Sequence, residues 1–284
     1  MTDQARARAA FRALHERGCF LIPNPWDAGS ARWLAHLGFK ALATTSSGFA
    51  FSRGMPDSDP PLTRETMLAH VAELAAATDL PVNADFKSGY ARDPEGVAES
   101  VRLCVETGVA GLSIEDSTGD PERPLFDRAE AVERVAAARA AIDRSGADVL
   151  LTARAECHLV GHPDPLDESL ARLRAYAAAG ADVLYAPGPR SREDIRAIVE
   201  AVAPKPVNVL MIGHTGLTLA DLEELGVRRV SVGSGLQRVA FTAFALAARA
   251  MADRGTFEGL DGLLSARELD AFFGSRERAR RSAY

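Results

Sequence analysis

Short apolar runs alternate with longer stretches of mixed apolar and polar residues along almost the whole chain. Most of the short runs lack the strict apolar–polar alternation of a strand that has one wet face. Runs that are apolar on both faces are typical of a parallel sheet covered by helices. We therefore expect eight strands, at residues 20–24, 41–46, 81–86, 111–116, 149–156, 183–188, 206–211 and 229–233.

The stretches between these runs have the spacing of amphipathic helices. The clearest are 27–38, 63–78, 93–108 and 164–180, and several of the stretches begin with Asp, Thr or Ser and end with Gly, as helix caps do. A glycine that ends a helix and leads directly into a strand recurs in HLGFKALAT, ETGVAGLSI, AAGADVLYA and ELGVRRVSV. Repetition of one strand–helix unit predicts an α/β fold of the (β/α)8 TIM-barrel type. The first strand is not followed by GxGxxG, which argues against a dinucleotide-binding sheet.

The length of 284 residues is compatible with one barrel that carries extra helices at its N- and C-terminal ends. Apolar residues make up 47% and charged residues 25%, so a large core is possible. No linker divides the chain. We expect a single domain over residues 1–284, with 256–284 as a C-terminal helical extension.

Charge and cysteine content narrow the class of protein. The net charge of −6 argues against nucleic-acid binding, which needs a basic face. Three cysteines without a CxxC pair favour a reduced, cytoplasmic protein. Residues 1–18 are charged and lack the apolar segment of a signal peptide. The longest apolar run, at 239–252, is too short to span a bilayer, so no membrane partner is expected.

Polar residues follow the predicted strands at the end where TIM-barrel active sites lie. In chain order these residues are Asn24, Trp26 and Asp27; Thr45, Ser46, Ser47 and Gly48, then Asp57 and Asp59 in the next loop; Asn83 and Asp85; Glu115 and Asp116; Arg154 and Glu156; and Asn208, followed by His214. The carboxylates that follow the second, third and fourth strands should converge, because these strands are neighbours.

Carboxylates that lie close together repel one another unless they are protonated or bound to a metal. An oxygen-rich cluster without Cys or His is suited to Mg²⁺, or Mn²⁺, rather than to zinc. Arg154, across the barrel, would bind a substrate carboxylate. The turn Ser46-Ser47-Gly48 offers hydroxyl and backbone N–H groups to another anionic oxygen. Together these features predict a site for a small 2-oxo acid in which a metal stabilises an enolate.

Simpler roles remain open for several of these residues. Asp85, Glu115 and Arg154 could form a purely structural ion-pair network inside the barrel. Asp116 could bond only to loop backbone, and Trp26 could pack at the barrel mouth instead of contacting substrate. Two further groups have expected structural roles: helix N-caps at Asp27, Asp93 and Asp164, and packing positions at Cys104 and Cys157.

Five segments in order resemble the isocitrate lyase/phosphoenolpyruvate mutase superfamily: TTSSGFAFSRGMPD, VNADFKSGY, GLSIEDS, TARAE and ELGVRRVSVG. The resemblance covers residues 18–245. It implies a (β/α)8 barrel, Mg²⁺, 2-oxo acid substrates or products, and an enolate intermediate. It also implies a homodimer or homotetramer, often with exchange of the eighth barrel helix between subunits. Residues 235–255 are the candidate for that helix.

The resemblance also implies roles for individual residues. Ser46, Ser47 and Gly48 match the turn that binds the substrate carboxylate. Trp26, Asp85 and Asn208 are further substrate-binding candidates because of their positions at strand ends. Asp57, Asp85 and Glu115 match the metal site. Arg154 matches the substrate-binding arginine, so Asp57, Glu115 and Arg154 are the expected catalytic residues.

Two departures from the family pattern affect the expected activity. Asn83 stands where the family has the first aspartate of Asp-x-Asp, which removes a negative charge beside the metal. The segment DSTGDPERPLFD stands where isocitrate and methylisocitrate lyases carry Lys-Lys-Cys-Gly-His, and it has no Cys, Lys or His. Both of these lyase activities are therefore disfavoured.

The expected function is a Mg²⁺-dependent carbon–carbon lyase for a small 2-oxo or 2-hydroxy acid or dicarboxylate, similar to oxaloacetate decarboxylases. A protein that binds a 2-oxo acid without turnover and a phosphonopyruvate-type enzyme of C–P bonds are alternatives. A further alternative is a phosphate-binding barrel that uses the loop at 233–235, although the carboxylate cluster would repel a phosphate that carries no metal.

Overall fold

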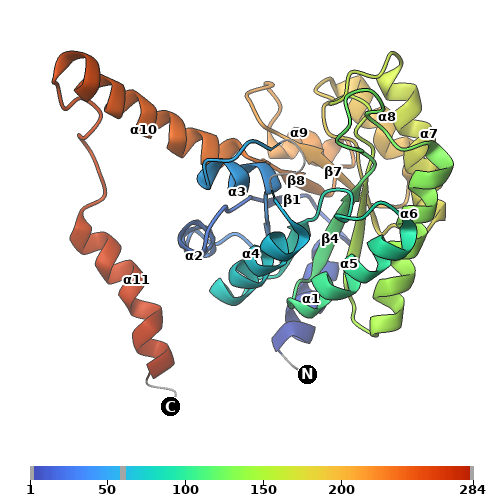
Figure 1. Ribbon diagram of the computed structural model, residues 1–284, viewed down its shortest axis with the longest axis horizontal. Helices are drawn as coiled ribbons and strands as arrows, with labels where there is room; N and C mark the ends of the chain where they lie inside the picture. Colours follow the sequence, from blue (N-terminus) through green and yellow to red (C-terminus); the bar gives the residue numbers. More distant parts are fainter. Residues whose placement is uncertain (1–2, 58–61, 282–284) are drawn as a thin grey trace. The chain divides into compact units, whose positions relative to one another are not determined.

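Eight parallel strands form one sheet in a computed structural model of the protein, which describes residues 3–57 and 62–281 (Figure 1). The order is β1-β8-β7-β6-β5-β4-β3-β2, and a backbone hydrogen bond from Ala43 to Pro23 brings the two outer strands together. The predicted (β/α)8 barrel is therefore confirmed. Its strands are β1 (Phe20–Ile22), β2 (Leu42–Ala43), β3 (Val82–Asp85), β4 (Gly111–Glu115), β5 (Leu150–Arg154), β6 (Val183–Tyr185), β7 (Val207–Leu210) and β8 (Arg229–Ser231).

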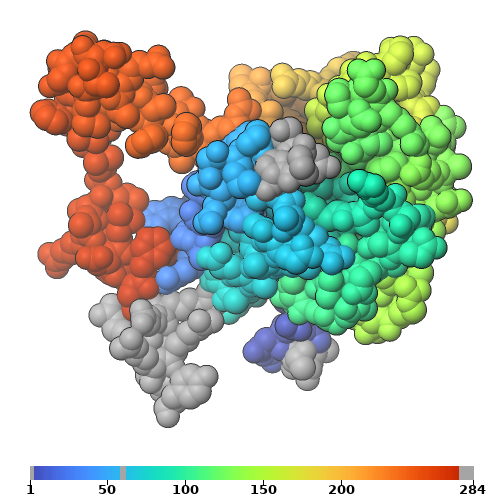
Figure 2. Space-filling view, in the orientation of Figure 1, coloured from blue at the N-terminus to red at the C-terminus, as the bar shows by residue number. Residues whose placement is uncertain are grey.

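Helices alternate with these strands in the first of two compact units, Met1–Leu236. They are α1 (Asp3–Leu14), α2 (Ala28–His36), α3 (Ser46–Ser52), α4 (Arg64–Ala77), α5 (Pro94–Glu106), α6 (Arg128–Ser145), α7 (Pro165–Ala178), α8 (Arg192–Val202) and α9 (Leu219–Glu224). Segments around α3 to α6, coloured from light blue to green, cover one face of this unit (Figure 2). All eight predicted strands are present, but each is shorter than expected, because residues at one or both of its predicted ends already belong to a loop or helix.

The second unit, Gln237–Tyr284, contains most of α10 (Gly235–Arg254) and all of α11 (Ala266–Arg281). These helices lie where the sequence predicts helices after the last strand. Helix α10 carries large apolar side chains that are exposed. Within the described ranges, none of the helices has both the length and the apolarity that a membrane span requires.

Two of the three predicted aspartate caps are confirmed. The Asp27 side chain accepts from the Ser30 N–H in a capping box, and the Asp93 side chain accepts from the Gly96 N–H. Asp164 precedes α7 as expected but makes no capping bond, so its predicted role is wrong. Its ψ of 70° differs from the 165° of Asp93, and its own N–H donates to His162.

The core supports the packing role expected for two cysteines. Cys104 and Cys157 are both fully buried in the largest apolar cluster. Burial raises the pKa of both thiols, to about 11 for Cys157. Neither thiol is therefore prepared to act as a nucleophile.

A second cluster closes the barrel at the beginning of its strands. Phe11 from α1 is fully buried there against Ile22 and Leu150. Gly111, at the start of β4, leaves the space for this ring: a Cβ at Gly111 would lie 2.7 Å from both the Phe11 ring and the Asn83 Oδ1.

We therefore expect Gly111→Ala to lower the free energy of unfolding by about 1–3 kcal/mol, because overpacking forces neighbouring groups to shift. Urea unfolding of the variant and the parent protein measures this loss. Gly213→Ala is the matched control, since nothing lies within 4 Å of its added Cβ, and it should change stability by less than about 0.5 kcal/mol. Equal effects of the two substitutions would contradict the packing explanation.

Helix α3, which carries residues of the polar cavity, is held by a buried aromatic contact. His70 of α4 stacks on Phe49 of α3, with ring centroids 3.7 Å apart and ring planes 7° from parallel. Neither His70 nitrogen has a hydrogen-bond partner in the described part of the chain. Burial lowers the pKa of His70 to about 4, against a partial opposing effect of Asp27.

Because the pKa of His70 is lowered, the folded protein should lose stability in acid. The unfolded chain binds a proton at His70 more readily than the folded chain, so stability is present above the ordinary histidine pKa and falls as the pH drops toward 4. At about pH 5 the expected loss is about 2 kcal/mol relative to neutral pH. Unfolding curves at both pH values should show a smaller loss for His70→Phe. His214→Phe, at an exposed histidine, should keep the loss of the parent protein.

Candidate active site

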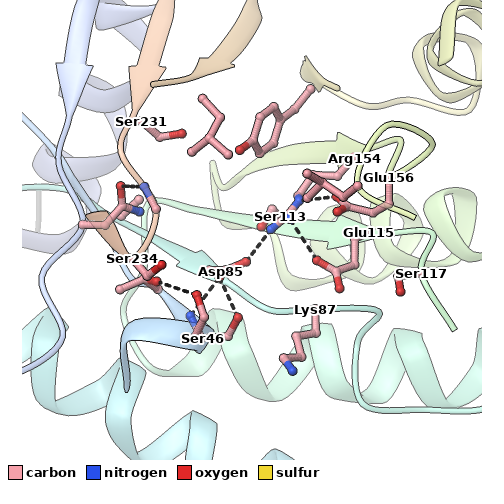
Figure 3. Close-up of a pocket in the computed structure, with 18 of the residues that line it drawn as sticks. Ser46, Asp85, Lys87, Ser113, Glu115, Ser117, Arg154, Glu156, Ser231 and Ser234 are labelled. Carbon is pink, nitrogen blue, oxygen red and sulfur yellow. Dashed lines mark hydrogen bonds and ion pairs between the residues drawn. The ribbon is translucent and has the colours of Figure 1, made fainter. Parts of the chain in front are cut away.

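A cavity of about 360 Å³ lies at the C-terminal ends of the barrel strands. Most of the predicted site residues line it, including Asn24, Ser46, Ser47, Asp57, Asn83, Asp85, Glu115, Arg154, Glu156 and Asn208. Figure 3 labels Ser46, Asp85, Glu115, Arg154 and Glu156 among them. They come from different strand ends, and the barrel brings them together. The described lining does not include Gly48, Trp26 or His214.

The Arg154 guanidinium is at the centre of the polar cluster. Its Nη1 lies 2.7 Å from Asp85, its Nη2 3.1 Å from Glu115 and its Nε 2.8 Å from Glu156 (Figure 3). Its guanidinium carbon also lies 5.1 Å from the centre of the Tyr185 ring. Three carboxylates therefore share one cation, and the structural ion-pair network considered from the sequence is present in this geometry.

The charges in this cluster strongly affect one another. Burial raises the pKa of Glu115 to about 8, and this shift prevails although Arg154 acts against it. Burial also raises the pKa of Glu156. Burial alone would lower the pKa of Arg154, but the surrounding carboxylates raise it well above its usual value. Arg154 is therefore charged, whereas Glu115 and Glu156 bind protons more readily than exposed glutamates do.

The Ser46-Ser47-Gly48 segment is the first turn of α3. Both the N–H and the Oγ of Ser46 donate to Asp85 Oδ2, each at 2.9 Å. The Gly48 N–H donates to the N-cap residue Thr45. Asp85 thus takes two of the donors that the sequence assigned to a substrate anion, while Ser47 still lines the cavity.

Asp57 has a partner that the sequence interpretation missed. Lys87 Nζ donates to the Asp57 carbonyl at 2.7 Å and lies 3.2 Å from Asp57 Oδ1. Burial raises the pKa of Asp57, partly offset by Lys87. The position of Lys87, two residues after Asp85 at a strand end, was the signal that could have identified it. Asp59 lies outside the described residues.

The amide side chains around the cavity are mostly engaged with the barrel itself. Asn24 Oδ1 accepts from the N–H groups of Val232 and Gly233. Asn208 donates to Ser231 and accepts from Arg229, a buried cavity residue that was also missed. Asn83 Oδ1 is buried without a hydrogen-bond partner among the described residues.

Trp26 is half-buried and is not part of the described cavity lining, so its contact with substrate stays a prediction.

Asp116 has a larger role than a bond to loop backbone. One of its oxygens accepts from the Glu156 N–H at 2.8 Å, and the other accepts from the Tyr176 hydroxyl at 2.6 Å and from Arg172 at 3.0 Å. The Asp116 carbonyl accepts from the Phe126 N–H. Asp116 therefore holds both the backbone of Glu156 and the base of the loop at 117–126.

That loop lies at the cavity wall. Ser117 and Leu125 form an antiparallel bridge, and the Thr118 N–H donates to the Pro124 carbonyl. Ser117, Thr118 and Gly119 line the cavity. The loop thus contributes hydroxyl groups to the site, where the lyase motif would contribute Lys, Cys and His.

The family resemblance implies a divalent cation, and the cavity offers oxygen ligands that suit such an ion. The available donors are oxygens, and the described lining of the cavity has four carboxylates beside three cations, Lys87, Arg154 and Arg229. In the described ranges, however, no three His, Cys, Asp or Glu side chains are grouped so that they could hold a metal by themselves. Mg²⁺ usually keeps several waters and binds through one or two carboxylates. The site therefore fits a largely hydrated Mg²⁺ better than a closed protein cage.

Comparisons with known proteins agree with this architecture. The family model described as phosphoenolpyruvate phosphomutase matches residues 11–252. A crystal structure of a Burkholderia cenocepacia J2315 protein, provisionally described as a lyase/mutase, has 49% identity and a TM-score of 0.93, and the match covers 96% of this chain and 98% of that one.

Two further relatives have an activity in their names. Oxaloacetate decarboxylase from Paraburkholderia xenovorans (strain LB400) is 32% identical over 82% of this chain and 76% of its own length. The structure of an oxaloacetate acetylhydrolase with its product oxalate is 29% identical, with a TM-score of 0.85 over 99% of this chain and 98% of that one. Both names refer to the same four-carbon oxo acid.

Proposed function

The chain belongs to the phosphoenolpyruvate phosphomutase family, and we propose that it is a Mg²⁺-dependent carbon–carbon lyase that acts on a small 2-oxo acid of the oxaloacetate type. The observation that carries the proposal is the cluster of Asp85, Glu115 and Glu156 around Arg154 in a cavity of about 360 Å³. The similarity to an oxaloacetate decarboxylase supports the same substrate class.

The proposed reaction cleaves the bond between C3 and C4 of oxaloacetate. The C4 carboxylate leaves as CO₂, the bonding electrons remain on the enolate of pyruvate, and a proton from water at C3 gives pyruvate. A Mg²⁺ ion, held through Asp85 and Glu115 with Asp57 nearby, would polarise the oxo group and take up part of the developing negative charge.

Arg154 would hold the substrate while this charge develops. A guanidinium has five N–H donors in a fixed plane, and three of its nitrogens already face carboxylates at one contact each. The remaining N–H groups on Nη1 and Nη2 can bind a substrate carboxylate without breaking the network. The hydroxyls of Ser47 and Ser117 are further donors at the cavity wall.

The first test is oxaloacetate decay, measured as pyruvate formed with Mg²⁺, with EDTA and without protein. We expect a metal-dependent rate well above the uncatalysed decay. Asp85→Ala should lower it at least about 100-fold, since even residues that only support a metal ligand account for about 10–100-fold. Asp143→Ala, at an exposed aspartate paired with Arg139, is the matched control and should keep the parent rate.

Other outcomes would point to the alternatives. Undiminished turnover by Asp85→Ala would refute the assigned role of this carboxylate. Tight binding of 2-oxo acids without turnover would favour a binding protein. Turnover of phosphonopyruvate in place of oxaloacetate would favour a C–P bond enzyme.

We also propose that the protein is a homodimer or homotetramer that buries α10 between its copies. Val239, Phe241, Phe244 and Leu246 of this helix are 55–67% exposed. Apolar side chains gathered in this way on one helix typically mark an interface.

Light scattering coupled to gel filtration should therefore give a mass of two or four chains. The double substitution F241S/F244S should shift the mass toward that of one chain. Leu37→Ser, at a leucine of α2's end that is 59% exposed, is the control and should leave the mass unchanged. A monomeric parent protein would overturn this proposal and leave the lyase proposal untouched.

A further inference from the structure

Lys87 is the one cavity cation whose side chain contacts a single residue in the described part of the chain. We propose that its ammonium group binds the second carboxylate of the substrate and so makes the site selective for dicarboxylates over monocarboxylates. This inference rests on the proposed function, because it names which acids the same cavity accepts.

The contacts of Lys87 leave it able to bind a ligand. Its side chain is 18% exposed and lines the cavity. The ammonium carries three N–H donors. Both of its contacts, to the carbonyl and to Oδ1, are made to Asp57, so at least one donor remains for an incoming anion. Asp57 fixes the position of the ammonium without using all of its hydrogen-bonding capacity.

The backbone of Lys87 is held in an unfavourable conformation. Its φ is +45°, in the left-handed region that is unfavourable for residues other than glycine. Two hydrogen bonds maintain it: the Glu115 N–H donates to the Lys87 carbonyl at 2.9 Å, and the Gly89 N–H donates to the Phe86 carbonyl. The turn after β3 thus ties Lys87 to the end of β4 and holds the side chain beside the carboxylates of the site.

The other cavity cations are less available. Each of three Arg154 nitrogens faces a carboxylate. The Arg229 nitrogens face Asn208, Thr152 and His15, on the barrel side of the cavity. In Figure 3, Lys87 lies on the other side of Asp85 and Glu115 from Arg154. A substrate with a carboxylate at each end could therefore engage Arg154 at one end and Lys87 at the other.

The loop at 117–126 does not offer a substitute for Lys87. Its one basic residue, Arg123, is paired with Glu130 at 2.6 Å. Its residues that line the cavity are Ser117, Thr118 and Gly119, which are uncharged. At this wall of the described cavity, discrimination between a carboxylate and a methyl group therefore depends on Lys87.

The test compares two ligands that differ only in this group. D-malate carries a carboxylate where D-2-hydroxybutyrate carries a methyl group, and calorimetry measures the binding of both with Mg²⁺ present and without any need for turnover. The parent protein should prefer D-malate. Lys87→Met, which keeps an unbranched side chain, should weaken D-malate binding about 10–100-fold, as expected for loss of a charge-assisted hydrogen bond, and should leave D-2-hydroxybutyrate within about twofold.

Two further variants test whether the effect on binding is specific to the positive charge at Lys87. Lys87→Arg should restore part of the preference for D-malate. Lys205→Met removes a lysine that donates to the Ala181 carbonyl outside the cavity, and it should bind both ligands like the parent protein. Equal weakening of both ligands by Lys87→Met, an unchanged preference, or binding of neither ligand by the parent protein would overturn the inference.

The outcome is separable from that of the proposed function. A preference for D-malate that Lys87→Met abolishes, together with an inactive parent protein in the oxaloacetate assay, would keep the inference and refute the lyase proposal. An active parent protein whose KM for oxaloacetate is unchanged in Lys87→Met would do the reverse.

Discussion

The pairing of one buried arginine with three carboxylates is the interaction on which the site depends. Asp85, Glu115 and Glu156 come from or follow three neighbouring strands, and each faces a different nitrogen of Arg154. Buried charges are expensive unless they are paired, and removal of one partner leaves the others uncompensated. The same ion pairs therefore organise three strand ends and gather carboxylate oxygens beside the cavity, where a divalent cation would bind.

The fold was predictable because its signals are local and repeated. A helix cap, an apolar face, a terminal glycine and a short apolar strand recur from unit to unit, and such repetition favours a barrel over an open sheet. Convergence of Asp85 and Glu115 was predictable for the same reason, since the topology itself brings strand ends together. Arg154 was expected across the barrel, but it lies on β5 beside Glu115 of the neighbouring strand β4. The superfamily resemblance added the implied roles of these residues, and the match to residues 11–252 confirms the family.

The sequence did not predict which residues of distant segments form hydrogen bonds with each other. Asp57 pairs with Lys87, thirty positions away, through a turn in which a lysine adopts a positive φ. Asp116 bonds to Tyr176, sixty positions away. A pattern of residue types cannot distinguish these pairings from others of similar chemistry. Asp164 shows the same limit on a smaller scale, because its residue type suits an N-cap but its ψ of 70° does not.

The anchoring of the loop at 117–126 has a consequence for how the site can be altered. Its first and last residues are joined by the Ser117–Leu125 bridge and by the bond from Phe126 to the Asp116 carbonyl. Asp116 in turn is bound to Tyr176 and Arg172 of α7. The tip between these anchors is therefore a replaceable module: its length and chemistry can be redesigned, or grafted from a relative, while the barrel and the arginine cluster keep their own supports.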